Sequence, residues 1–142
     1  MTRRGTYTRA VVHLAAALYG AWWGVLIDFM RLNGAPFTWW SRVLIAGAIV
    51  LAAGGVLTWT PARRWAALVA LVGSAALVVF FVPACVLMFG QGDLPNVSFR
   101  LISQLLSRVA GAALVLVSFG VAAHDVARGA VGARLRTPPS PS

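Results

Sequence analysis

Four long, continuously apolar runs, separated by short polar connections, constrain this chain more than any other feature of its sequence. A helix needs about 20 residues to cross the roughly 30 Å hydrocarbon layer of a bilayer, whereas the strands of outer-membrane barrels alternate in segments of about ten residues. The runs do not alternate and are longer than such strands, so they predict transmembrane α-helices. We expect the spans at residues 10–30, 43–59, 65–89 and 101–123.

The composition excludes a soluble domain. Of the 142 residues, 60% are hydrophobic and 11% are charged, whereas an average soluble protein has about 25% charged residues. So few charges cannot cover the surface of a soluble protein. The sequence therefore predicts an all-α membrane protein, in which residues 1–133 form one compact antiparallel bundle of four helices in the lipid bilayer. Residues 134–142, rich in proline and serine, are expected to form a disordered tail.

Proline, glycine and threonine mark the predicted ends of the helices. Connections around residues 33–36 and 90–96 contain the glycine and proline that are typical of turns. Thr60 is suited to cap the third helix, and Pro61 to occupy its first turn. Pro83 removes a backbone hydrogen bond inside the third run, so this helix is expected to kink there or to end early.

The arginines predict the orientation of the helices. The net charge is +9, and all twelve basic residues are arginines that lie in ones and twos between the apolar runs. This pattern is typical of topology signals rather than of a nucleic-acid surface. One side of the predicted bundle carries Arg3, Arg4, Arg9, Arg63, Arg64, Arg128, Arg134 and Arg136, and the other carries Arg31, Arg42 and Arg100. Because positively charged loops stay inside, we expect an uncleaved multi-pass protein of a bacterial cell membrane, with both termini cytoplasmic.

An intramembrane ion pair is the first candidate site. Asp28 lies in the outer part of the first run and Arg108 in the outer part of the fourth, at comparable expected depths. If these helices are neighbours, Asp28 and Arg108 can pair, with Gln104 one turn from Arg108 for a further hydrogen bond. Placing a charge at the centre of a membrane helix costs roughly 2.5–3.5 kcal/mol. The pair either fixes the packing of the two helices or makes Asp28 a proton or cation site that Arg108 gates. Alternatively the pair does not form, and Asp28 bonds Arg31 one turn away while the Arg108 side chain extends to the membrane surface.

A second polar cluster is expected at the inner end of the same two helices. His13 lies near the start of the first run, and His124 and Asp125 close the fourth. Two imidazoles and a carboxylate have the chemistry of metal ligands, but adjacent residues of a helix point about 100° apart. We therefore expect interfacial polar contacts, with Asp125 near Arg128, and no metal site.

Small residues recur at every fourth position in the first run, at Ala16, Gly20 and Gly24. Such a stripe lets the backbones of two helices approach closely, and glycine inside a helix carries a cost in stability. This face is therefore expected to pack against another helix. That helix belongs either to the same bundle or to a second copy of the chain.

The sequence contains no signature of an enzyme. It has no lysine, no glutamate and a single cysteine, Cys85, which excludes phosphate loops that end in lysine, metalloprotease helices and paired-cysteine redox motifs. No cofactor is expected. The leading hypothesis is a structural or accessory membrane protein that acts through helix packing, either as a homo-oligomer or with a larger membrane partner.

The alternative is a small oligomeric transporter or channel that uses Asp28 as a proton or cation site. In size and helix count the chain is similar to the small multidrug resistance transporters. That family places an essential glutamate well inside its first helix, whereas this sequence has no glutamate and Asp28 lies nearer to the end of the run. The resemblance therefore covers the architecture only.

Overall fold

The computed structural model describes residues 3–32, 39–60, 62–90 and 99–134. Within these ranges the chain forms four α-helices, and it forms no β-strand. The helices are α1 (Arg3–Leu32), α2 (Trp40–Leu57), α3 (Arg63–Gly90) and α4 (Phe99–Arg134). The prediction of an all-helical protein is therefore confirmed.

Each helix contains an apolar stretch that is long enough to cross a membrane. These stretches are Gly5–Met30, Trp40–Leu57, Trp65–Ala84 and Ser107–Gly129. The shortest has 18 residues, which at about 1.5 Å per residue extend over roughly 27 Å, close to the thickness of a hydrocarbon layer. The prediction of four helices with the length and composition of membrane spans is confirmed.

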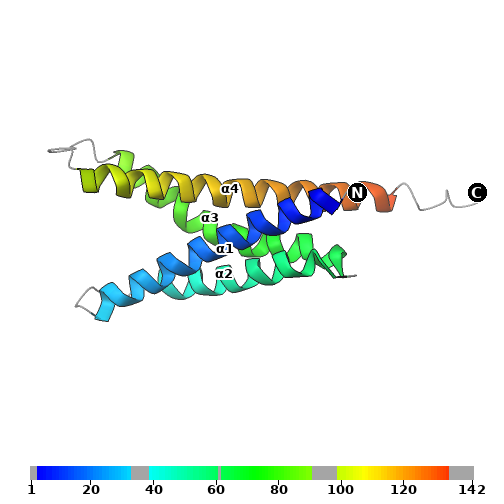
Figure 1. The fold of residues 1–142 in the computed structure, drawn as a ribbon, viewed down its shortest axis with the longest axis horizontal. Helices are drawn as coiled ribbons and strands as arrows, with labels where there is room; N and C mark the ends of the chain where they lie inside the picture. Colours follow the sequence, from blue (N-terminus) through cyan, green and yellow to red (C-terminus); the bar gives the residue numbers. More distant parts are fainter. Residues whose placement is uncertain (1–2, 33–38, 61, 91–98, 135–142) are drawn as a thin grey trace, which may run out of the picture.

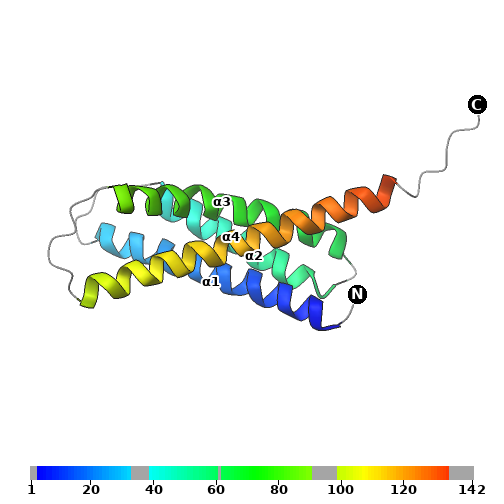
Figure 2. The ribbon, with the colours of Figure 1, turned by 90° about the horizontal axis from the view of Figure 1, so that it is seen from above.

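α1, α3 and α4 extend beyond the predicted runs, whereas α2 begins three residues earlier and ends two residues earlier than its run. α1 begins at Arg3 rather than near residue 10, and α4 continues to Arg134 rather than ending near residue 123. An apolar run ends where polar side chains begin, whereas a helix ends where its pattern of backbone hydrogen bonds ends. The two boundaries need not fall at the same residue. α4 accordingly projects beyond the other helices at its C-terminal end (Figures 1 and 2). Residues 135–142 of the predicted tail lie outside the described residues.

Pro83 does not end α3. The helix continues through Pro83 to Gly90, and the proline is exposed on its surface. The apolar stretch of α3, however, ends at Ala84, directly after the proline. The predicted connections around 33–36 and 91–96 lie outside the described residues, as does Pro61.

A tight turn joins α2 to α3, and two threonines satisfy its backbone groups. The Thr58 hydroxyl donates to the Gly55 carbonyl (2.6 Å), and the Thr60 hydroxyl donates to the Leu57 carbonyl (2.9 Å). These carbonyls belong to the last turn of α2, and they also accept hydrogen bonds from the backbone amides of Thr58 (3.3 Å) and Thr60 (3.1 Å). The Thr60 hydroxyl oxygen also accepts a hydrogen bond from the Ala62 amide (3.3 Å), two residues along the chain, as in a threonine turn. The prediction that Thr60 caps α3 is wrong, because α3 begins at Arg63 and Ala62 precedes it.

α2 and α3 form the centre of the packing. α2 contacts α1 and α3 extensively, α4 packs on α3 and to a smaller extent on α1, and α1 and α3 barely touch. In Figure 1, α1 lies close to α4 where the chain begins and diverges from it toward the opposite end, and Figure 2 shows α4 crossing the bundle obliquely. We call the end that holds Arg3 and Arg134 the termini end, and the opposite end, where α1 finishes and α4 begins, the far end.

Glycines bring the backbones of α2 and α3 into contact. A methyl group at Gly54 would lie 2.6 Å from the Ala70 amide nitrogen, and a methyl group at Gly73 would overlap the backbone of Leu51. Ala70 and Leu51 are themselves fully buried. In lipid, no hydrophobic effect drives helices together, so the van der Waals contact that small residues permit supplies much of the attraction.

The small-residue stripe of α1 lies inside the same packing. Ala16, Gly20 and Gly24 are all buried. A methyl group at Gly20 would lie 2.8 Å from the Leu77 side chain of α3, and one at Gly24 would lie 2.6 Å from the Ile45 side chain of α2. Of the two partners considered for this stripe, the structure shows helices of the same chain.

Replacing Gly54 with alanine is expected to destabilise the protein by about 1–3 kcal/mol, because the added methyl group meets backbone atoms that no side-chain rotation can move. Gly120 is the matched control, since it is exposed on α4 and a methyl group there would meet no atom within 4 Å. Thermal unfolding in detergent micelles measures both variants. Equal midpoints for Gly54→Ala and Gly120→Ala would contradict the close approach of α2 and α3.

Candidate functional site

Polar side chains gather where α1 meets α4, in a contact that we call the α1–α4 seam. From the termini end to the far end, Arg9, His13, Tyr19 and Trp23 of α1 meet Asp125, Ser118, Ser107 and Arg108 of α4, respectively. The pairs of Arg9, His13 and Trp23 follow one antiparallel register to within about a turn, and the long Tyr19 side chain reaches more than a turn further along α4. Two of the four buried polar residues that the structure describes, His13 and Ser118, lie in this seam, and the other two, Ser41 and Ser74, lie on α2 and α3.

An ion pair closes the seam at the termini end. Arg9 Nη1 donates to Asp125 Oδ2 over 2.7 Å, and the two side chains are 25% and 19% exposed. Removing one member of such a pair would leave the other charge partly buried and uncompensated. Asp125 belongs to the polar cluster that the sequence predicts for this end, but its ion-pair partner is Arg9 of α1 and not Arg128 of its own helix.

A buried hydrogen bond lies one turn further into the bundle. His13 Nδ1 and Ser118 Oγ are 2.8 Å apart, His13 is 2% exposed and Ser118 is fully buried. His124 is exposed, so the structure brings His13 and Asp125 to one seam and leaves His124 outside it. Among the described residues, no group of three histidine, cysteine, aspartate or glutamate side chains could hold a metal ion.

Sequence reasoning did not identify Arg9 and Ser118 as members of this network. A signal was present, because Arg9 lies one helical turn before His13, and Ser118 lies two turns before Asp125. Residues at these spacings share a face of a helix. Each helix therefore presents two polar groups on one face, a pattern that the strongly apolar composition conceals.

Tyr19 fills the middle of the seam. Its ring packs directly against Gly111, where a methyl group would overlap the ring. Its hydroxyl donates to the Ser107 carbonyl at 3.0 Å, so the polar tip of a ring within an apolar stretch has an acceptor. Gly111 thus provides the space that lets an aromatic ring enter the interface between two helices.

At the far end of the seam, Arg108 lies over Trp23. The guanidinium carbon is 5.0 Å from the centre of the Trp23 ring, within the range of a cation–π contact. Asp28, the predicted partner of Arg108, lies about 7.5 Å beyond Trp23 along α1, where α1 and α4 diverge (Figure 1). No ion pair joins Asp28 to Arg108 among the described interactions, and the side chain of Gln104 lies outside the described part of the structure.

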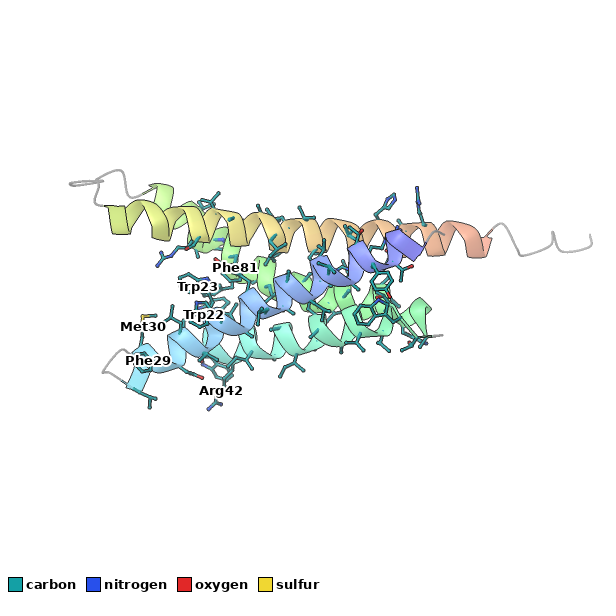
Figure 3. The ribbon with its side chains drawn as sticks, in the orientation of Figure 1. Trp22, Trp23, Phe29, Met30, Arg42 and Phe81 are labelled. Carbon is teal, nitrogen blue, oxygen red and sulfur yellow. The ribbon has the colours of Figure 1, made fainter. Side chains whose placement is uncertain are left out.

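A layer of aromatic rings crosses the bundle at the level of Trp23. It consists of Trp40 of α2, Phe80 and Phe81 of α3, and Tyr19 and Trp23 of α1, with neighbouring ring centres 5.1–6.4 Å apart. We call this set the aromatic layer, and Arg108 extends it to α4. Figure 3 shows Trp23 and Phe81 at a similar level, with Phe29 and Met30 further toward the end of α1.

A second group of rings marks the termini end. The ring centres of Tyr7 and Trp59 are 6.2 Å apart, and both rings are exposed, as is that of Trp65. From Trp40 to Leu57, two residues before Trp59, α2 rises by about 26 Å. Arg108 adjoins the first group of rings, and Arg9 lies close to the second along α1. The charged groups of the seam therefore lie near the two aromatic levels rather than midway between them.

Replacing His13 with alanine is expected to lower the free energy of unfolding by about 2–3 kcal/mol, because the buried Ser118 hydroxyl would lose its partner and a cavity would form. His124→Ala is the matched control, since His124 lies at the same end of the bundle but is exposed. Its effect is expected to stay within about 0.5 kcal/mol. Denaturant unfolding in micelles measures both, and an equal loss in the two variants would refute the buried role of His13.

Comparison with known proteins adds no relative. No protein family, no curated protein and no solved structure matches this chain. No match therefore supports the likeness in size and helix count to the small multidrug resistance transporters.

Proposed function

We propose that this chain is an integral membrane protein whose four helices cross a bacterial cell membrane as an antiparallel bundle. The apolar stretch of each helix supports this placement, and so do the two groups of rings, because tryptophan and tyrosine collect at both faces of a bilayer. The hydrocarbon layer then lies between the aromatic layer and the rings of Tyr7, Trp59 and Trp65. Exposed aliphatic side chains between these levels, such as Leu18 and Val72, contact lipid.

The termini end is proposed to face the cytoplasm. The arginines that the sequence assigns to the inner side adjoin the start of α1, the start of α3 and the end of α4. Fewer arginines adjoin the far end, among them Arg42 and Arg108. An excess of arginine on one side directs that side inward, which supports cytoplasmic N and C termini.

Within the membrane, the protein is proposed to act as a structural or accessory protein through helix packing. The observation that carries this proposal is that the ionisable groups of the seam bond to side chains of the facing helix. Asp125 is paired with Arg9, and His13 is bonded to Ser118, so these groups hold two helices together instead of facing a substrate. No enzymatic role is proposed.

The proposed partner is a second copy of the chain or a larger membrane protein. It would bind a helix face other than the stripe of Ala16, Gly20 and Gly24, because Leu77 and Ile45 of the same chain already fill that face. The available faces are those whose side chains point away from the bundle. Helix association there would rely on shape and van der Waals contact, as it does inside the bundle.

The alternative function, a small oligomeric transporter or channel, depends on Asp28. Asp28 is the carboxylate that the described residues place near the far end, and it is only partly buried. The aromatic layer argues against a role at membrane depth, because Asp28 lies about 7.5 Å beyond Trp23 toward the end of α1. In the proposed placement this carboxylate is close to water, where it needs no partner.

Reporter fusions test the proposed orientation. Green fluorescent protein fused after Ser142 is expected to fluoresce, and alkaline phosphatase at the same place is expected to be inactive, because the arginine-rich side stays in the cytoplasm. Phosphatase inserted in the connection between α3 and α4 is expected to be active. Active phosphatase after Ser142 would overturn the orientation.

Flux measurements distinguish the two functions. Liposomes that contain the purified protein are expected to dissipate a pH gradient no faster than empty liposomes, and Asp28→Asn is expected to leave this rate unchanged. A fluorescent pH indicator inside the liposomes reports the flux. Flux that the wild type supports and Asp28→Asn abolishes, with helical content retained, would refute the accessory role in favour of transport.

A further inference from the structure

We infer that Arg108 and Trp23 form a binding site for the phosphate group of a membrane lipid at the far end of the α1–α4 seam. The inference rests on the proposed membrane placement of the helices and does not depend on the accessory role. It assigns a ligand class to a charged group that lies within the apolar stretch of α4.

The depth of Arg108 suits a lipid phosphate. Arg108 is the second residue of the apolar stretch of α4, which begins at Ser107. Through Trp23 it joins the aromatic layer, which reaches Trp40 at the first residue of the apolar stretch of α2. Since tryptophan rings sit at the level of the headgroups, the guanidinium lies next to the layer where lipid phosphates are found.

The geometry of Arg108 suits the same ligand. A guanidinium is planar, so it can stack one face on an aromatic ring while its N–H groups form a fork in its own plane. Trp23 holds the guanidinium carbon 5.0 Å from its ring centre, and Arg108 is only partly buried. A guanidinium held in this way is oriented for the bidentate hydrogen bonds that Arg makes to phosphate oxygens.

The surroundings favour a lipid over a soluble phosphate. The acyl chains of a lipid bound at Arg108 would extend from the phosphate into the hydrocarbon layer, toward the termini end. On that side of Arg108, Leu18 of α1 and Leu116 of α4 are 74% and 46% exposed. An acyl chain can cover such exposed apolar side chains, whereas a free phosphate would leave them uncovered. The shared chemistry is a phosphate ester, and the apolar flank selects the lipid.

Lipid binding to the whole protein in detergent, followed by native mass spectrometry, tests the site with three probes. Phosphatidylglycerol has the phosphate and the chains, diacylglycerol has the chains alone, and glycerol 3-phosphate has the phosphate alone. The wild type is expected to bind phosphatidylglycerol at least about tenfold more tightly than either of the others, because both parts contribute. Equal binding of glycerol 3-phosphate would overturn the lipid assignment.

Substitutions locate the site. Arg108→Gln is expected to weaken phosphatidylglycerol binding about tenfold or more and to leave diacylglycerol binding unchanged. Arg42→Gln is the matched control, because Arg42 is an exposed arginine of α2 near the same end and points away from the bundle (Figure 3). Its effect is expected to stay below about twofold, since it removes only a diffuse attraction. An equal loss in both variants, or no loss in Arg108→Gln, would overturn the proposal.

Arg108→Lys keeps the test decisive if Arg108→Gln is recovered poorly, because it retains the positive charge. Lysine cannot present the planar fork or stack in the same way on Trp23, so weaker phosphatidylglycerol binding is expected here too. Unchanged binding in Arg108→Lys would refute the proposed geometry. A failure of membrane insertion itself would differ from all these outcomes, because the reporter fusions of the wild-type chain would then show no consistent orientation.

Discussion

The contact between the backbones of α2 and α3 is the interaction on which the rest of the structure depends. At Gly54 and Gly73 the helices approach so closely that a methyl group would overlap the facing backbone. In lipid, apolar side chains gain nothing by leaving the solvent, so association relies on such close van der Waals contact. α1 then packs on α2, and α4 packs on α3. The place where α1 and α4 meet follows from this arrangement, and so does the position of the polar seam.

The seam fixes the register of α1 against α4 more than it stabilises their association. α1 and α4 touch less extensively than the other neighbouring helices, yet they share the ion pair of Arg9 with Asp125 and the hydrogen bond of His13 with Ser118. A slide of one helical turn, about 5.4 Å, would break both contacts together. Partly buried ion pairs add little net stability, but they penalise arrangements that leave one charge alone. We therefore assign the seam a role in specifying one arrangement of the helices.

The candidate sites show how far sequence reasoning reaches. Helix geometry alone indicates that His124 and Asp125 cannot both face α1, and the rotation of α4 decides that Asp125 does. The predicted proximity of Asp28 and Arg108 depended on how far α1 and α4 are shifted along each other. Arg108 lies opposite Trp23, which is equally far from the far end of its own helix, whereas Asp28 is nearer to that end. Apolar runs do not locate helix ends, so the sequence could not establish this register.

The sequence by itself determined the class of protein: four helices of membrane length, with small residues at every fourth position of α1 and arginines concentrated on one side. These properties depend on composition and on spacing along one helix, which the chain displays directly. Only the tertiary structure decided that the stripe of α1 packs inside the bundle, that Arg9 is the partner of Asp125, and that aromatic rings of α1, α2 and α3 connect to Arg108 of α4. These depend on how side chains of different helices fit together, because an apolar surface is compatible with many rotations and only close packing selects one.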